Sequence, residues 1–115
     1  IFIYITMKIK IKENTFDVKV ADTWFKRRTR LMLHKPINFA LLIPNCIKIH
    51  TYFMKDNIDI LVINEKNSVL YKYQNLSKNK IILLEEDIKK TSILELPKNT
   101  SKKIHIGDVL TFESE

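Results

Sequence analysis

The chain has 115 residues, of which 45% are hydrophobic, and it carries a formal net charge of +7. This length and hydrophobic content fit one ordinary domain with its own core, which excludes a disordered tail. A single cysteine excludes an intrachain disulfide, so a reducing cytoplasm is the simplest location. We therefore expect one cytoplasmic domain that exists as a monomer.

The chain opens with the apolar stretch IFIYIT, which lasts only six residues before Met7 and Lys8. A membrane-spanning helix needs about 20 apolar residues, so this stretch does not predict a span. In a signal peptide the charges precede the apolar stretch, whereas here they follow it. We interpret Met7 as the natural start, residues 1–6 as a non-native or disordered extension, and residues 7–115 as the domain.

Strand patterns dominate the rest of the chain. KIKIKE (8–13) and FDVKV (16–20) alternate apolar and polar residues around the turn-forming ENT, which predicts a hairpin. One short helix is expected near residues 23–32, with Asp22 or Thr23 as its N-cap and Pro36 soon after its end.

Further runs rich in branched and aromatic residues predict additional strands. These runs are 39–43, 49–54, 58–63, 68–74, 80–84, 92–96 and 109–112. The runs at 58–63 and 68–74 flank the polar turn NEKN and predict a second hairpin, and EEDIKK (85–90) is expected as a turn or helical fragment. The pattern predicts a mainly β, compact single-domain fold, sandwich-like or barrel-like, of short and mostly antiparallel strands.

Several common functional motifs are absent. The only glycine is Gly107, and phosphate loops and dinucleotide fingerprints need several glycines. The sequence also lacks the G-x-S-x-G, H-E-x-x-H and C-x-x-C patterns. We therefore expect no cofactor and no metal, and we lean towards a protein that is not an enzyme.

Three blocks of the sequence carry a family resemblance. VADTWFKRRTRLM, LLIPNCIKIHTYFMKDNIDILVIN and ILELPKNTSKKIHIGDVLTF follow the order and spacing of the uncharacterised family called domain of unknown function 192. The resemblance runs from Val18 to Phe112. It implies a β-rich, sandwich-like single domain, and it implies no activity because none is established for the family.

Individual positions of this chain match the family pattern. They are Ala21, Asp22, Thr23, Arg27, Cys46, His50, Thr51, Met54, Asp59, Glu95, Leu96, Pro97, Gly107 and Asp108. Three departures concern turns: Arg30 stands where the family has glycine, Asp56-Asn57 replaces an aromatic-Pro pair, and Lys98-Asn99 replaces Ala-Gly.

Cys46 and His50 raise the question of a reactive site. On a regular strand they would share a face with Cβ atoms about 13 Å apart, although a turn at Pro44-Asn45 would bring them closer. A nucleophilic pair also needs an orienting third group, and a zinc site needs three or four ligands, which the sequence does not place nearby. We favour a buried, structural Cys46.

A binding groove is the preferred interpretation of the second block. If Ile49 faces the core, His50 and Tyr52 face outward, and with Lys55 and Asp59 they would bind a polar ligand. Asp59 would need a partner, such as Lys55 or Arg27. The structural alternative for Asp59 is a hydrogen bond to the backbone of a turn, and the sequence leaves both open.

The positive charge lies in the first half of the chain, where residues 1–57 hold 11 Lys or Arg against 4 Asp or Glu. Much of it is the cluster Lys26, Arg27, Arg28 and Arg30, a weak candidate for anion binding whose simpler interpretation is a solvated helix face.

Three functional hypotheses follow from these residues. The preferred one is a non-enzymatic β-domain that binds a small polar ligand or a protein partner. The alternatives are a small hydrolase that uses Cys46 or His50, and nucleic-acid binding through residues 26–30, which we consider the less favoured partner class.

Overall fold

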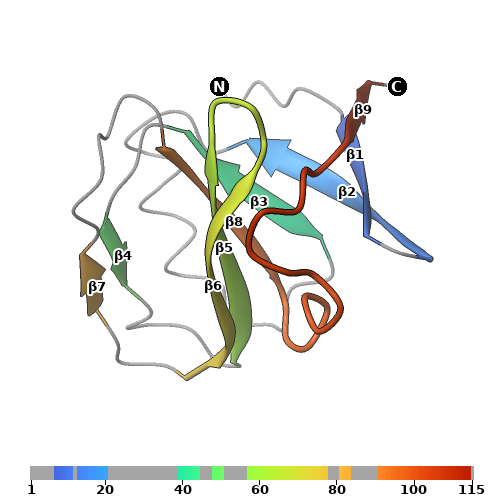
Figure 1. Ribbon diagram of the computed structural model, residues 1–115. Helices are drawn as coiled ribbons and strands as arrows, with labels where there is room; N and C mark the ends of the chain where they lie inside the picture. Colours follow the sequence, from blue (N-terminus) through green and yellow to red (C-terminus); the bar gives the residue numbers. More distant parts are fainter. Residues whose placement is uncertain are drawn as a thin grey trace, which may run out of the picture.

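A mixed seven-stranded β-sheet is the main element in the described part of the computed structural model (Figure 1). The structure describes residues 7–11, 13–20, 39–44, 57–77 and 91–114, and the backbone alone of 48–50 and 81–83. Its strands in chain order are β1 (Met7–Ile11), β2 (Asn14–Val20), β3 (Ala40–Ile43), β4 (Lys48–His50), β5 (Ile58–Asn64), β6 (Val69–Leu76), β7 (Ile81–Leu83), β8 (Thr91–Pro97) and β9 (Phe112–Ser114). The strand order in the large sheet is β6-β5-β8-β3-β2-β1-β9, and β4 pairs with β7 in a second, two-stranded sheet.

Both predicted hairpins are confirmed. β1 and β2 pair antiparallel with Ile9 opposite Phe16, and β5 and β6 pair antiparallel with Leu61 opposite Lys72. In β1 the alternation predicted from KIKIKE places Ile9 and Ile11 in the core and leaves Lys10 exposed. The apolar and polar alternation of these segments therefore sets which face each side chain occupies.

The remaining pairings of the large sheet are mostly antiparallel. β8 lies between β3 and β5 and runs antiparallel to both, whereas β2 and β3 form the parallel pair, with Val18 opposite Ala40. β5 and β8 are the most deeply buried strands, and each contains a near-continuous apolar run. Such runs are typical of strands that are covered on both faces.

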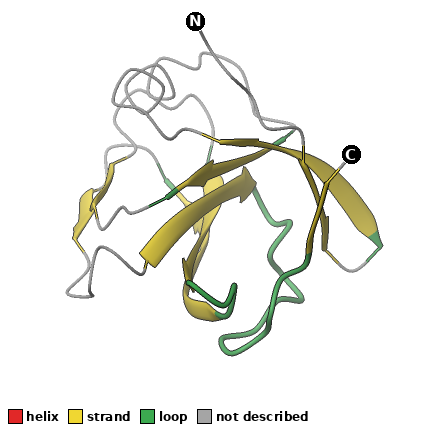
Figure 2. Cartoon of the chain, turned by 90° about the horizontal axis from the view of Figure 1, so that it is seen from above, coloured by secondary structure: helices red, strands yellow, loops and turns green. Residues whose placement is uncertain are grey.

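The C-terminal segment connects β6, at one end of the sheet, with β1, near the other end. Its residues 107–110 bond to the start of β6, through Val69 N–H to Asp108 O (2.8 Å) and Leu110 N–H to Asn67 O (2.8 Å). The chain then continues as β9, which pairs with β1 at the other end of the sheet (Figure 1). The strongly curved sheet seen from above in Figure 2 is consequently bridged between β6 and β1, which gives a barrel-like shape.

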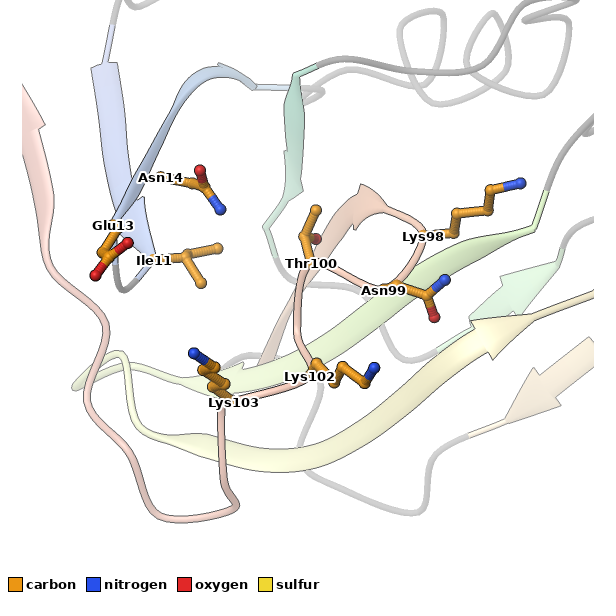
Figure 3. Close-up of a pocket in the computed structure, with 8 residues that line it drawn as sticks. All are labelled: Ile11, Glu13, Asn14, Lys98, Asn99, Thr100, Lys102 and Lys103. Carbon is orange, nitrogen blue, oxygen red and sulfur yellow. The ribbon is translucent and has the colours of Figure 1, made fainter.

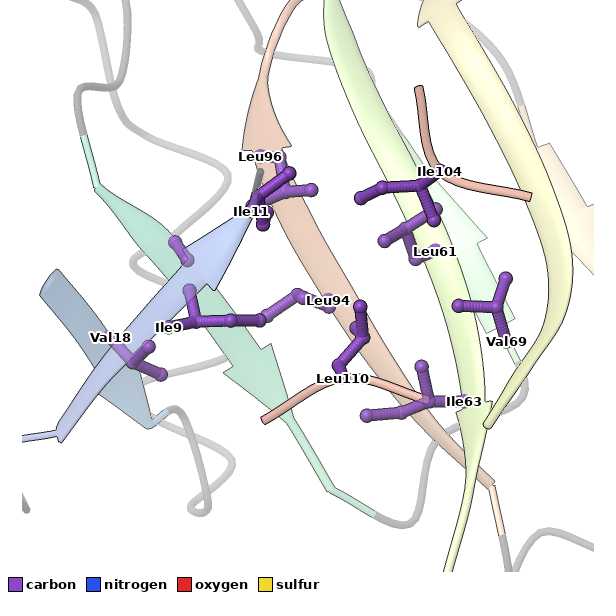
Figure 4. Close-up of a cluster of buried hydrophobic side chains, with 11 residues drawn as sticks. Ile9, Ile11, Val18, Leu61, Ile63, Val69, Leu94, Leu96, Ile104 and Leu110 are labelled. Carbon is purple, nitrogen blue, oxygen red and sulfur yellow. The ribbon is translucent and has the colours of Figure 1, made fainter. Parts of the chain in front are cut away.

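Two apolar clusters occupy the opposite faces of the sheet. The first lies on the concave side, where Ile104 and Leu110 of the C-terminal segment cover strand residues such as Leu61 and Leu94 (Figure 4). The second lies on the other face of the central strands and consists of Leu41, Ile43, Ile58, Ile60, Val62 and Ile93. Burial of a fully buried aliphatic side chain contributes about 1.5–3 kcal/mol, so both clusters stabilise the sheet.

The fold class predicted from the sequence is confirmed: the protein is mainly β and compact, with a Cα radius of gyration of 12.9 Å. The last strand differs in position, because the run expected at 109–112 forms a strand only from Phe112. Val109 instead makes an isolated bridge to Ser68. The helix expected near 23–32 and the fragment at 85–90 lie outside the described residues.

Candidate functional site

Asp59 is the member of the predicted groove whose side chain the structure describes. Of the other three, His50 is described by its backbone alone, opposite Ile81, and Tyr52 and Lys55 lie outside the described residues. The family positions Asp22, Cys46, Thr51 and Met54 and the basic cluster Lys26, Arg27, Arg28 and Arg30 also lie outside them. The groove predicted around His50 therefore stays a prediction.

The carboxylate of Asp59 is completely buried at the start of β5. Its Oδ1 accepts hydrogen bonds from the backbone N–H groups of Asn75 and Asn99, each at 2.8 Å. Its Oδ2 accepts from the backbone N–H of Ser101 at 2.8 Å and from the Ser101 hydroxyl at 2.5 Å. These four donors come from the end of β6 and from the loop after β8, both of which are far from Asp59 in the sequence.

The hydrogen bonds of Asp59 favour the structural alternative for this residue. A carboxylate offers about four acceptor positions, and the described donors fill that number. The lone pairs of Asp59 are thus used within the protein, and a ligand could reach them only by displacing one of these donors. Through Asn99 and Ser101, Asp59 fixes the loop after β8.

That loop, residues 98–103, is called the lysine turn here because it contains Lys98, Lys102 and Lys103. The backbone N–H and the hydroxyl of Thr100 both donate to Pro97 O, at 3.2 and 2.7 Å. On the far side of the lysine turn, Lys72 Nζ donates to Ile104 O at 2.9 Å. Together with Asp59, these bonds hold the lysine turn in one backbone conformation.

A groove of about 540 Å³ separates the lysine turn from the β1–β2 hairpin (Figure 3). We call it the turn groove. It is lined by Ile11, Glu13, Asn14, Lys98, Asn99, Thr100, Lys102 and Lys103. Its volume is within the range of about 300–1,000 Å³ that is usual for small-molecule sites.

The turn groove was not predicted from the sequence. Its two sides are more than 80 residues apart in the chain, and the parallel and antiparallel pairings that bring them together have no local sequence signal. A signal was nevertheless present on one side, because KNTSKK places three lysines within six residues directly after β8.

Two buried carboxyl groups of the described residues lie close in the sheet but on opposite faces. Asp59 pairs with Leu96 and shares the face of the first cluster, while Glu95 pairs with Ile60 and shares the face of the second. A hydrolytic carboxylate pair needs both groups on the same side of a substrate-sized space. Asp59 and Glu95 do not form such a pair, and no group of three metal-binding side chains occurs in the described part of the chain.

Comparison with known proteins decides the family. The model of DUF192, described as "Uncharacterized ACR", matches residues 5–112. The chain belongs to the DUF192 family.

A relative of known sequence agrees with membership of the DUF192 family. The chain is 38% identical over 69 residues to the "UPF0127 protein" of Thermococcus sibiricus, a match that covers 55% of this chain and 45% of that protein. The chain therefore spans less than half of the length of this relative.

Two solved structures share the DUF192 fold of this chain. A protein of unknown function from Novosphingobium aromaticivorans superposes with a TM-score of 0.74 at 12% identity, covering 94% of this chain and 84% of that one. A protein from Sinorhizobium meliloti described as "a putative transcription regulator" gives 0.71 at 16% identity, covering 99% and 97%. At these identities the likeness concerns the fold alone.

Two DUF192 positions in the C-terminal block have structural explanations. Asn99 stands where the family has glycine, and its φ is +66°, a left-handed conformation that asparagine tolerates better than most residues. Gly107 has a φ of +96°, and the Asp108 carboxylate accepts from His105 N–H at 2.9 Å within the same turn. Asn99 and Gly107 are thus residue types that suit the left-handed backbone of these two turns.

In the described part of this DUF192 chain, no helix is long and apolar enough to cross a membrane.

Proposed function

We propose that this DUF192 domain is a non-enzymatic binding module that holds a small polar ligand in the turn groove. The observation that carries the proposal is an open space of about 540 Å³ whose described lining residues, apart from Ile11, each carry a polar or charged group. A site of this size with a few oriented polar groups is the usual form of a small-molecule site.

The rigidity of the lysine turn supports this location. Asp59 and Pro97 each hold part of its backbone, and Lys72 bonds to Ile104 O directly after it. A side of the groove that is already ordered loses little conformational freedom when a ligand binds. The placement of Asp59 and Glu95 on opposite faces supports a binding function over a hydrolytic one.

The test is a thermal-shift screen of the purified protein against sugars, cell-wall fragments, nucleotides, sugar phosphates and divalent metals. A ligand at 100 times its dissociation constant stabilises the folded state by about 2.7 kcal/mol, which raises Tm by on the order of 10 °C for a chain of this size. Asn14 is exposed at the edge of the turn groove, so the Asn14→Trp variant fills the space without disturbing the core. We expect this variant to lose the shift.

Two results would contradict the proposal. A screen without any hit from a cooperatively folding sample would argue against a small-molecule function and favour a protein partner. A hit that persists in Asn14→Trp would place the ligand elsewhere, and the predicted groove of His50, Tyr52 and Lys55 would then be tested with His50→Ala.

A further inference from the structure

The ladder of paired residues between β1 and β9 stops before the end of β1. Its last pair joins Ile9 to Phe112, and the final two residues of β1 have no partner in β9. Two residues before Phe112, Leu110 N–H donates instead to Asn67 O, in the turn that leads into β6 (2.8 Å). This bond holds the chain beside the start of β6, and in Figure 1 the red segment runs from there to β9. The chain therefore leaves the edge of β1 open at its end.

A space of about 270 Å³ lies at this opening, and we call it the strand gap. Lys10 and Ile11 line it on the β1 side, and Ile104 and residues 108–111 line it on the other side. Its volume is below the range of about 300–1,000 Å³ that is usual for small-molecule sites. Among the described lining residues one base, Lys10, and one acid, Asp108, balance each other. The strand gap thus has no charge preference for an anion or a cation.

Val109 offers an unused backbone edge in the strand gap. On either side of it, Asp108 C=O and Leu110 N–H both bond towards β6, each at 2.8 Å, and Val109 itself lies opposite Ser68 in the bridge. In a paired, extended backbone the N–H and C=O groups of successive residues point to alternate edges. Those of Val109 consequently point away from β6, and no hydrogen bond within the described part of the chain involves them.

Exposed apolar side chains accompany this edge. The side chain of Val109 is 68% exposed, and that of Ile106, in the turn directly before it, is 67% exposed. The turn is held in place because Gly107 N–H donates to Val69 O at 2.8 Å. Natural proteins protect open strand edges with lysine or proline, and residues 106–111 contain neither. Two exposed aliphatic side chains beside an unpaired edge favour a protein partner.

We propose that the strand gap binds an extended, uncharged peptide segment of a partner protein, which adds as a strand to the edge of Val109. Val109 N–H donates to a peptide carbonyl, Val109 C=O accepts from a peptide N–H, and apolar peptide side chains pack on Val109 and Ile106. In this mode of recognition main-chain bonds supply affinity, and alternate side chains supply specificity. The strand gap is separate from the turn groove, although Ile11 lines both, so the inference does not rest on the proposed function.

The test is amide hydrogen exchange measured by NMR on the full chain, without and with acetyl-TVTVT-amide, an uncharged peptide of high β propensity. In the free protein we expect the Val109 amide to exchange at least about 100-fold faster than the Leu110 amide, because only the latter is bonded. Peptide at saturating concentration should slow the exchange of Val109 by at least about tenfold. The same peptide with every backbone amide N-methylated has no donors and should bind at least about tenfold more weakly.

Matched variants connect the binding to this edge. Val109→Pro removes the N–H that donates to the peptide, and proline is accepted at edge positions whose N–H is not part of a ladder. Val109→Thr keeps both the N–H and the β-branched shape. We expect the proline variant to weaken peptide binding by at least about tenfold and the threonine variant to change it by less than about threefold. If Val109→Pro does not fold, hydrogen exchange in the unsubstituted chain decides the question.

Several outcomes would overturn the inference. Slow exchange of the Val109 amide in the free protein would show that its edge is already paired. Equal binding of the peptide and its N-methylated analogue, or equal binding by the two variants, would show that main-chain pairing does not hold the peptide. No binding at millimolar peptide would also reject the site. Asn14→Trp fills the turn groove and should leave peptide binding unchanged, so a loss in this variant would place the peptide in the turn groove instead.

Discussion

Replacing Asp59 should destabilise the protein strongly, and the structure allows the size of the effect to be worked out. In Asp59→Asn the remaining carbonyl oxygen can still accept from Asn75 and Asn99, but it does so as a neutral group. The new amide NH₂ then faces the N–H of Ser101, so one buried donor loses its acceptor. An unsatisfied buried donor costs about 1–3 kcal/mol, and the weaker acceptor adds to this. We expect a total loss of about 2–4 kcal/mol.

Urea denaturation followed by circular dichroism measures this loss as a change in the free energy of unfolding. For a chain of this size, about 2–4 kcal/mol corresponds to a fall in Tm on the order of 10 °C. Asp17→Asn on the exposed face of β2 makes the same chemical change without buried partners and serves as the control. If Asp59→Asn lost no more stability than Asp17→Asn, the role given to this carboxylate would be wrong.

Three further substitutions test separate parts of the structure by the same measurement. Asn99→Ala should cost about 1 kcal/mol and Asn99→Gly should cost nothing, because φ is +66° there, and the reverse order would contradict the turn assignment. Leu94→Ala should cost about 2–5 kcal/mol since Leu94 is fully buried, whereas Ile106→Ala, at a side chain 67% exposed, should change stability little; equal effects would refute the assigned core. Lys72→Met should cost about 1–2 kcal/mol through the lost bond to Ile104 O, and an unchanged stability would show that this bond does not hold the lysine turn.

The alternation of apolar and polar residues predicted the two hairpins. It did not predict which strands pair when they lie far apart in the sequence. Alternation in KIKIKE and FDVKV is a property of adjacent residues, so it identified β1 and β2 and the face of Ile9. Residues 109–112 are also rich in branched and aromatic residues, but only Phe112 of that run lies in β9. Val109 pairs with Ser68, some 40 residues earlier, and nothing near it in the sequence indicates this partner.

The surroundings of Asp59 were likewise predicted only in part from the sequence. The apolar neighbours of Asp59 indicated that its carboxylate needs partners, and a turn backbone was one of the two alternatives considered. The actual donors, Asn75, Asn99 and Ser101, are 16 to 42 residues away, and each donates a backbone N–H that every residue but proline carries. Their choice depends on the position of β5 beside β8 and β6, which only the assembled sheet determines.

The pairing of β9 with β1 has a consequence for how the chain folds. Met7 lies opposite Ser114, so the contact that completes the sheet joins residues more than 100 positions apart. Contacts of this separation carry a large loop-closure entropy, and proteins dominated by them fold slowly, in milliseconds to seconds. On the ribosome, β1 and β2 can form their hairpin early, but β1 has to wait for almost all of the remaining chain before its outer edge is covered. During that time the edge of β1 is available to other chains, and its alternating lysines, with Lys10 exposed, are the kind of charge that discourages such pairing.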